Sequence, residues 1–343
     1  MSTKMFVGLV AGLWLRVFAF AVPSTPVVSP APVAKVNQVL LKNEIAWGNL
    51  ANQAYVAPEL LSQSTTTLGV YLPSPASQAA EYLAGNNKCV TLDANGIPVV
   101  QYQTCRVDNI VPKPFYNPGT VAAFALGLWN LGGHNQQFLA ECNWLVANQS
   151  QNGIFQVDIP IPMLGLGPGW ASAMYQGEAT SALLRAWQMT GNETYLTAAA
   201  KAIAPLTQTS SAVVKWTPYG QWPQEYAAPS PPSVLNGALT ALFGLLDYQQ
   251  ATGKSVPAIG TFTATLNKML PVLTVPGWAK YEVVGNDMAS VDYMALQTQE
   301  LGLFGLKTND QTAIVYANLW RSDLNSESAA QERAANRIIP SGE

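Results

Sequence analysis

Glu225 and Tyr226 stand side by side in a proline-bounded loop, within the stretch QWPQEYAAPSPPSVLNG that runs from Gln221 to Gly237. A carboxylate can take up a proton and return it. A tyrosine, whose reference pKa is about 10, can donate to a strongly basic carbanion, or act as a base if its pKa is lowered. The pair is therefore open to two interpretations, an ordinary surface turn or a site of proton transfer.

A second phenol follows a carboxylate much further along the chain, in ASVDYMALQ, where Asp292 precedes Tyr293. Tyr293 therefore repeats, in another loop, the residue types of the Glu225–Tyr226 pair.

Aromatic residues recur in four connecting loops, which carry Trp170, Trp222, Trp278 with Tyr281, and Tyr293. Sugar rings stack well on tryptophan and tyrosine because both partners offer apolar faces with polar rims. Each aromatic residue alone could equally cap a hydrophobic core. The recurrence of the same chemistry in four loops favours a carbohydrate site.

Helices must position these loops. From Tyr116 onward, apolar periodicity alternates with glycine-containing turns, and Asn117–Pro118 has the form of a cap followed by a first-turn proline. Helices are expected at about residues 117–131, 135–152, 171–190, 193–206, 231–252, 259–275, 288–306 and 310–324. Repeated helical hairpins stack into a solenoid or close into a ring. We expect a mainly α fold, an α/α toroid in the form of an incomplete barrel of helical hairpins.

The N-terminal third divides by composition. Residues 1–21 carry Lys4, an apolar run and the small-x-small sequence Ala19–Ala21, which predicts a signal peptide, or else an uncleaved anchor in a Golgi-type lumen. Entry into the secretory pathway, and secretion, are then expected. A Pro/Ser-rich linker at 22–37, a hairpin-containing segment at 38–110, the helical domain at 111–330 and a tail at 331–343 complete the predicted organisation.

Three cysteines are present. Cys89 and Cys105 flank alternating apolar and polar residues around Asn95–Gly96, which predicts a β-hairpin. A disulfide at its base would suit an oxidising compartment. Cys142 lies in a helical pattern and is expected to be a buried free thiol.

Composition argues against several classes of function. The chain of 343 residues has a net charge of −3, only 11% charged residues and no Lys/Arg run, so nucleic-acid binding is not expected. His134 is the one histidine of the sequence. A multi-histidine metal site is therefore excluded, and a histidine-based catalytic triad is not expected. We expect no metal and no cofactor.

The order and spacing of these motifs are similar to a known family over about residues 112–305. GWASAMYQGEATSALLRAWQMTGNETYLTAAAKAIAPL followed by WPQEYAAPSPPSVLNGALTALFGLLDY resembles the C-terminal catalytic domain of D-glucuronyl C5-epimerases, which modify heparan sulfate and heparosan. The matching positions are Gly169, Trp170, Gln176, Gly177, Thr190, Gly191, Glu225, Tyr226, Val234, Leu235, Asn236 and Gly237.

The resemblance implies inversion at C5 of a uronic acid, with Glu225, Tyr226 and Tyr293 in the proton-transfer roles. The substrate-binding positions it suggests are Tyr281, Asn236, Gln176, Trp170 and, at the start of the first helical hairpin, Asn117. Three positions depart from the family. Val284 stands where the family has a basic residue, and Met294 and Gln297 stand where it has histidines.

The leading hypothesis is thus an isomerase, a uronosyl C5-epimerase acting on an acidic, glucuronate-containing polysaccharide, and a homodimer is possible. A uronate lyase shares the first proton abstraction. A glycoside hydrolase would need a second carboxylate flanking the bond, for which Asp292 is the one evident candidate. A catalytically inactive glycan-binding protein is the alternative from a different class.

Overall fold

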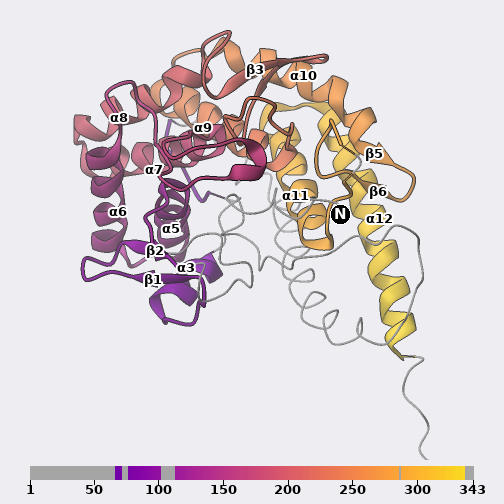
Figure 1. Ribbon diagram of the computed structural model, residues 1–343, viewed down its shortest axis with the longest axis horizontal. Coiled ribbons are helices and arrows are strands. Elements are labelled where there is room, and N and C mark those ends of the chain that lie inside the picture. Colours follow the sequence, from indigo (N-terminus) through magenta and orange to yellow (C-terminus); the bar gives the residue numbers. More distant parts are fainter. Residues whose placement is uncertain (1–65, 72–75, 102–112, 286, 337–343) are drawn as a thin grey trace, which may run out of the picture. The chain divides into compact units, whose positions relative to one another are not determined.

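The computed structural model describes residues 66–71, 76–101, 113–285 and 287–336, and this part of the chain is mainly helical (Figure 1). It contains nine α-helices and three two-stranded antiparallel sheets. The chain divides into two compact units, which among the described residues are 66–266 and 267–336.

The first unit is built from two layers of helices. The inner helices α5 (Pro118–Leu131), α7 (Ala173–Thr190) and α9 (Leu235–Thr252) are buried on nearly all sides, whereas the outer helices α6 (Asn135–Asn148) and α8 (Glu193–Ile203) bury one face. Helix α7 packs against both other inner helices and both outer ones. The shorter elements are α3 (Ala76–Leu83) and the 3₁₀ helices η3 (Pro162–Leu164) and η4 (Ala204–Leu206).

Two glycines allow α7 and α9 to approach backbone to backbone. A methyl group added at Gly177 would lie 2.5 Å from the carbonyl oxygen of Thr240, and one added at Gly244 would lie 2.5 Å from the Cα of Gly177. Glycine costs a helix about 1 kcal/mol relative to alanine. Close contact between the two inner helices explains why the sequence keeps both glycines despite that cost.

Three helix ends follow the predicted capping signals, whereas α6, expected to run to about residue 152, ends at Asn148. The Asn117 side chain accepts from the backbone N–H of Gly119 and Pro118 is the first helical residue of α5. Gly191 and Gly253 end α7 and α9 in the left-handed conformation that glycine adopts without strain. The expected cap and the two expected stops are confirmed.

Two hairpins belong to the first unit. β1 (Val90–Leu92) pairs with β2 (Pro98–Val100), and Gly96 in the turn has φ of 83°, so the hairpin predicted around Asn95–Gly96 is confirmed. β3 (Val214–Thr217) pairs with β4 (Gly220–Pro223), which leads directly into the Glu225 loop. Cys142 is buried and free, as expected.

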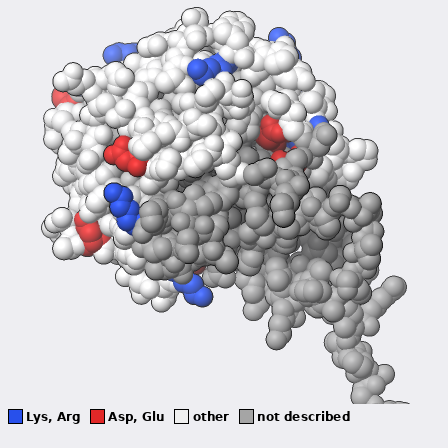
Figure 2. Space-filling view, viewed as in Figure 1, with Lys and Arg blue, Asp and Glu red and all other residues white. Residues whose placement is uncertain are grey.

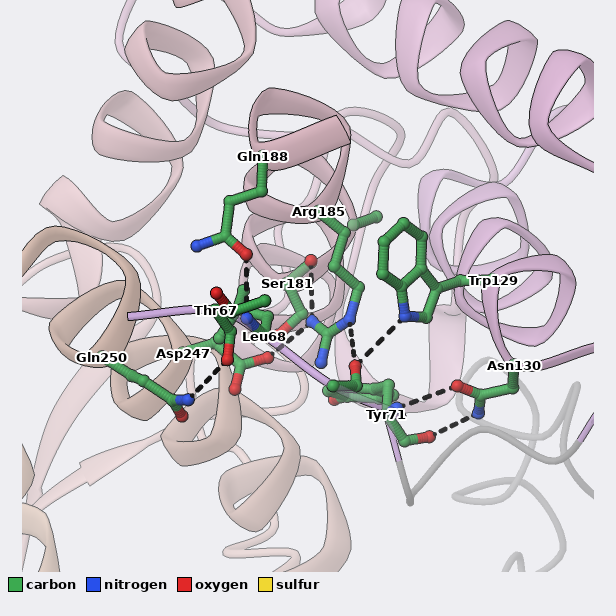
Figure 3. A network of polar contacts seen from close by, with 12 residues as sticks. Thr67, Leu68, Tyr71, Trp129, Asn130, Ser181, Arg185, Gln188, Asp247 and Gln250 are labelled. Carbon is green, nitrogen blue, oxygen red and sulfur yellow. Dashed lines mark hydrogen bonds and ion pairs between the residues drawn. The ribbon is translucent and has the colours of Figure 1, made fainter. Parts of the chain in front are cut away.

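An extended segment, residues 66–71, crosses the C-terminal halves of the three inner helices (Figure 3). Arg185 of α7 organises it. The guanidinium donates to the carbonyl oxygen of Gly69 at 3.1 Å, pairs with Asp247 of α9 at 2.7 Å and lies over the Tyr71 ring at 5.2 Å. Arg185 is both ion-paired and buried, with 1% of its surface exposed.

The same segment is held through its backbone by side chains from all three inner helices. The contacts come from Trp129 and Asn130 of α5, Gln188 of α7 and Gln250 of α9. Because these bonds engage peptide groups, they fix the path of the segment largely independently of its side chains.

The second unit is a helical hairpin with a small sheet. α11 (Val291–Thr308) and α12 (Gln311–Asn336) pack together around a left-handed turn at Asn309, and β5 (Thr274–Val275) pairs with β6 (Trp278–Ala279). Helix α10 (Pro257–Leu273) contains the boundary between the units. Helix α12 runs to Asn336, well past the end expected near residue 324, because its last turns are rich in alanine and charged helix formers rather than in apolar residues.

Several predictions fall on other parts of the chain. The signal peptide at 1–21, the linker at 22–37, residues 38–65, Cys105 and residues 337–343 lie outside the described residues, so the Cys89–Cys105 disulfide stays a prediction. None of the described helices combines the length and apolar character needed to cross a bilayer. Charged side chains are scattered singly over the described surface that Figure 2 shows, so uncharged residues make up most of that face.

Candidate functional site

The loop that carries Glu225 is fastened to two neighbouring segments. The N–H of Ala173 donates to the carbonyl oxygen of Gln224 at 2.8 Å, and the N–H of Gln224 donates to that of Val213 at 2.8 Å. The N–H of Ala227 donates to the carbonyl oxygen of Ala171 at 3.0 Å. The Glu-Tyr pair is therefore held on both sides at the start of α7, and it is not a free surface turn.

Glu225 is a buried carboxyl group with little polar support. Only 1% of the residue is exposed, and its carboxyl oxygens accept no backbone N–H group of the described residues. Burial raises the pKa of Glu225 to about 8, and the neighbouring Tyr226 side chain acts in the opposite direction. A carboxyl group with a pKa near neutrality can serve as a general acid or base at physiological pH.

Tyr226 is fully buried in an aromatic cluster. Its ring lies 5.8 Å from the ring of Trp170, which lies 6.1 Å from that of Tyr175. The indole N–H of Trp170 donates to the carbonyl oxygen of Ile159 at 2.8 Å. Trp170 is thus oriented by the backbone and lies against Tyr226, which suits support of the phenol better than stacking on a sugar.

Asn117 joins this cluster through Tyr175. Besides capping α5, its side-chain amide donates to the Tyr175 hydroxyl at 3.3 Å. The absence of a side chain at Gly119 leaves space for the Tyr175 ring over the first turn of α5. Asn117 is fully buried, and both of these contacts are within the protein.

Gln176 is saturated by backbone groups. Its side-chain oxygen accepts from Phe155 N–H at 2.8 Å, and its amide nitrogen donates to the carbonyl oxygens of Gly153 at 2.9 Å and Ala202 at 2.7 Å. Both amide hydrogens are therefore donated to backbone carbonyl groups, and Gln176 holds the loop after α6 against α7 and α8.

Buried polar atoms without hydrogen bonds gather around the Glu225 loop and the first turn of α9. They are Trp222 Nε1, Gln224 Oε1, both Glu225 carboxyl oxygens and Asn236 Oδ1. Buried polar groups in folded proteins nearly always find a partner. Such a concentration within one loop and the following helix turn is expected where a polar ligand or water completes the bonding.

In the second unit, Tyr281 and Tyr293 are in direct contact. Their ring centroids are 4.6 Å apart and the planes meet at 66°, an edge-to-face arrangement. The N–H of Tyr281 donates to the carbonyl oxygen of Asp287 at 2.8 Å. Tyr293 lies in the first turn of α11, where its N–H donates to Oγ of Ser290 at 3.3 Å. The structure therefore brings together the two tyrosines that the sequence separates by a loop.

The turn after Tyr281 contains Val284, one of the positions at which the sequence differs from the epimerase family. The carboxylate of Glu282 accepts from the N–H groups of Val284 and Gly285, so it closes a tight turn, and Val284 itself is 76% exposed. Lys280 Nζ donates to the carbonyl oxygen of Gly285 at 3.5 Å. A basic side chain is therefore present at this turn, from a position four residues before Val284.

Gln297 is completely buried one helical turn after Tyr293. Its amide nitrogen donates to the carbonyl oxygen of Lys280 at 3.3 Å, while its Oε1 has no hydrogen bond from a described residue. Met294 is also fully buried. No group of three or more potential metal-ligating side chains occurs in the described part of the chain.

Comparison with known families supplies the deciding observation. Residues 149–322 match the model of the D-glucuronyl C5-epimerase C-terminus, which is about half of the chain. The chain belongs to this family. The matched region contains Trp170, Gln176, the Glu225 loop, Asn236 and both tyrosines of the second unit, whereas Asn117 lies before it.

Two relatives place this family member among known proteins. The chain is 39% identical over 123 residues to a D-glucuronyl C5-epimerase of Caenorhabditis elegans, and the aligned region covers 34% of this chain and 20% of the worm protein. It is 28% identical over 179 residues to an uncharacterized protein of Methanocaldococcus jannaschii, and the aligned region covers 49% of this chain and 57% of the archaeal protein. The chain thus spans less than two thirds of the length of either relative.

Glu141 of α6, which like Glu225 is a buried carboxyl group, lies outside the region that matches the epimerase family. Gln137 donates to its Oε1 at 2.6 Å, and Oε2 has no hydrogen bond from a described residue. Burial, offset in part by Gln137 and reinforced by the negative charge of Asp93, raises the pKa of Glu141 to about 9. Glu141 is therefore protonated at neutral pH in the folded protein.

Replacing Glu141 with Gln is expected to stabilise the protein increasingly as pH rises. A raised folded-state pKa favours folding below the unfolded value of 4.5, and that contribution is lost as pH rises through about 9. Between about pH 5 and pH 8 the wild type should lose about 1.4 kcal/mol per pH unit relative to the variant. Urea unfolding at both pH values measures this difference; an unchanged difference between wild type and variant would contradict it.

Proposed function

We propose that this chain is a uronosyl C5-epimerase that inverts C5 of glucuronate residues within an acidic polysaccharide. Family membership supports an epimerase, and the Glu225 loop is the observation that carries the proposal. A buried carboxyl group with a pKa of about 8 stands beside a buried phenol, among polar atoms that lack protein partners.

The proposed reaction begins at the C5 hydrogen, which is acidified by the adjacent carboxylate of the sugar. Ionised Glu225 removes this proton, and the C5–H electron pair moves into the carboxylate to give an enediolate. An acid then donates a proton to C5 from the opposite face, which restores the C–H bond with inverted configuration. Family resemblance, rather than any contact with Glu225, makes Tyr293 the candidate for this acid. Glu225 is left protonated and the acid deprotonated, so exchange with solvent returns both groups to their starting states.

The remaining residues are given supporting roles. Tyr226 contacts Glu225 and helps to set its protonation state, while Tyr281 orients Tyr293 by ring contact. Asn236, in the first turn of α9, is a candidate donor to the sugar. Lys280, whose Nζ donates to the carbonyl oxygen of Gly285 next to Val284, is a candidate partner for the substrate carboxylate. Closure of the helical hairpins into a toroid, entry into the secretory pathway and a homodimeric state remain parts of this proposal.

A lyase is the second candidate, because it shares the abstraction at C5 and then expels the C4 substituent. Glu225 with a phenol would suit either reaction. A binding protein without activity is the third, since Val284, Met294 and Gln297 occupy positions where the family has basic residues.

Incubation with heparosan in deuterated water distinguishes the three. Deuterium at C5 without chain cleavage is the expected result, whereas new ultraviolet absorbance from an unsaturated uronate would indicate a lyase. Binding with neither outcome would leave a glycan-binding protein. Tyr293→Phe and Tyr226→Phe should each reduce exchange, the former by roughly 100-fold or more. Full exchange in both variants would remove these tyrosines from the mechanism.

A further inference from the structure

The carboxyl group of Glu225 rests directly on a glycine of α9. A methyl group added at Gly237 would lie 2.6 Å from Glu225 Oε2, 2.7 Å from its Cβ and 2.8 Å from its Cγ. Real Cβ atoms almost never approach other heavy atoms this closely, so the Glu225 side chain lies in space that every other residue type would fill. Three atoms of one side chain are involved, so rotation about one bond cannot relieve the conflict.

Gly237 lies at the third position of α9, in the part of the helix with unsatisfied N–H groups. The N-cap residue Val234 makes no side-chain hydrogen bond to this turn. A negative charge near a helix N-terminus is stabilised by the partial positive charge there. The ionised form of Glu225 would therefore gain support from α9 at this location, which counteracts part of the cost of burying it.

Glycine at this position has no other evident purpose. It lies inside a helix, where it is unfavourable relative to alanine, and it does not adopt a positive φ. The three atoms nearest to the added methyl group all belong to Glu225. This distinguishes it from Gly177 and Gly244, where the added group would meet the backbone of the facing helix.

We infer that Gly237 is a positioning residue for C5 epimerisation, which holds the Glu225 carboxyl group against the first turn of α9 at the place from which it removes the C5 proton. This inference rests on the proposed function. Gly237 does not touch the substrate; it acts by leaving the space that Glu225 occupies. Any side chain there displaces the carboxyl group and moves it out of the field of the helix start.

The test is Gly237→Ala, measured by deuterium incorporation at C5 of heparosan. Displacement of a reacting group by about 1 Å can cost on the order of 100-fold in rate, and we expect a loss of that size in the rate at saturating substrate. The pH midpoint of exchange should shift, because burial and the field of the helix start act on the pKa of Glu225 in opposite directions and both change when the carboxyl group is displaced. Gly260→Ala is the matched control, because Gly260 is also helical and an added methyl group there meets nothing within 4 Å. It should leave exchange and the pH midpoint unchanged.

A double-mutant cycle tests the contact without using activity. Gly237→Ala should destabilise the wild type but not the Glu225→Gly variant, in which all three conflicting atoms are absent. Equal destabilisation in both backgrounds, or wild-type exchange with an unshifted pH midpoint in Gly237→Ala, would overturn the inference. If the wild type shows no exchange at C5, the proposed function fails, and the cycle still decides whether Gly237 seats Glu225.

Discussion

Glu225→Gln is expected to lower deuterium incorporation at C5 by roughly 100- to 10,000-fold, the range that loss of a general base produces. Glutamine keeps the size and shape of the side chain, so its contact with Gly237 is retained. It cannot accept the C5 proton as a carboxylate does. Nuclear magnetic resonance of heparosan recovered from deuterated water measures the change.

The pH dependence of deuterium exchange in the wild type also tests whether Glu225 is the base. Burial raises the pKa of Glu225 to about 8, so the ionised fraction grows about tenfold per pH unit below that value. Exchange should rise with pH and level off above about pH 8. Stability moves in the opposite direction, since a raised pKa favours folding below the unfolded value of 4.5 and that contribution is lost as pH rises through about 8.

Glu141→Gln is the matched control for this experiment. It also neutralises a buried carboxyl group of raised pKa, on a helix outside the Glu225 loop. It should change stability as Glu225→Gln does and leave exchange intact. Near-wild-type exchange in Glu225→Gln, or the same loss in both variants, would show that Glu225 is not the base.

Arg185→Met is expected to reduce the free energy of unfolding by about 3–5 kcal/mol, the cost of leaving a buried charge without its partner. Asp247 is 1% exposed and its Oδ2 lies 2.7 Å from the guanidinium, so methionine leaves this carboxylate without its cation in the core. The carbonyl oxygen of Gly69 would lose one donor as well. Urea unfolding at neutral pH measures the difference.

The double variant Arg185→Met with Asp247→Leu separates the charge from the packing. Replacing both members of a buried ion pair with apolar residues is often close to neutral, so most of the lost stability should return. A double variant as unstable as Arg185→Met would show that the contacts of the guanidinium with residues 66–71 matter more than its pairing with Asp247.

Local signals predicted the helices well. Asn117, Gly191 and Gly253 act through bonds within a few residues of themselves, so their effect is visible in the sequence. Helix α12 was expected to end too early because its apolar pattern stops before its helix-forming residues do. A toroidal arrangement depends on contacts between distant helices, which periodicity does not encode.

The candidate site could be predicted by residue type but not by role. Glu225 and Tyr226 could be predicted because a carboxylate next to a phenol is recognisable in the sequence. The burial of Glu225, which raises its pKa to about 8, could not be predicted from it. Gln176 matched a family position, yet its amide serves three backbone groups that lie 21 to 26 residues away. Gly237 was noted as part of a motif. Its importance comes from a side chain it lacks, so only the structure shows what fills the space.

Residues 66–71 show that the folding unit extends beyond the region shared with the epimerases. The family match begins at residue 149, yet α7 and α9 within it are bonded at their C-terminal halves to residues 66–71, and α7 also packs against α5. Both residues 66–71 and α5 precede the match. A fragment trimmed to residues 149–322 would expose the apolar side of α7 and leave Arg185 without its Gly69 acceptor. The smallest piece worth producing in isolation therefore starts before residue 66, even though the shared family region begins 83 residues later.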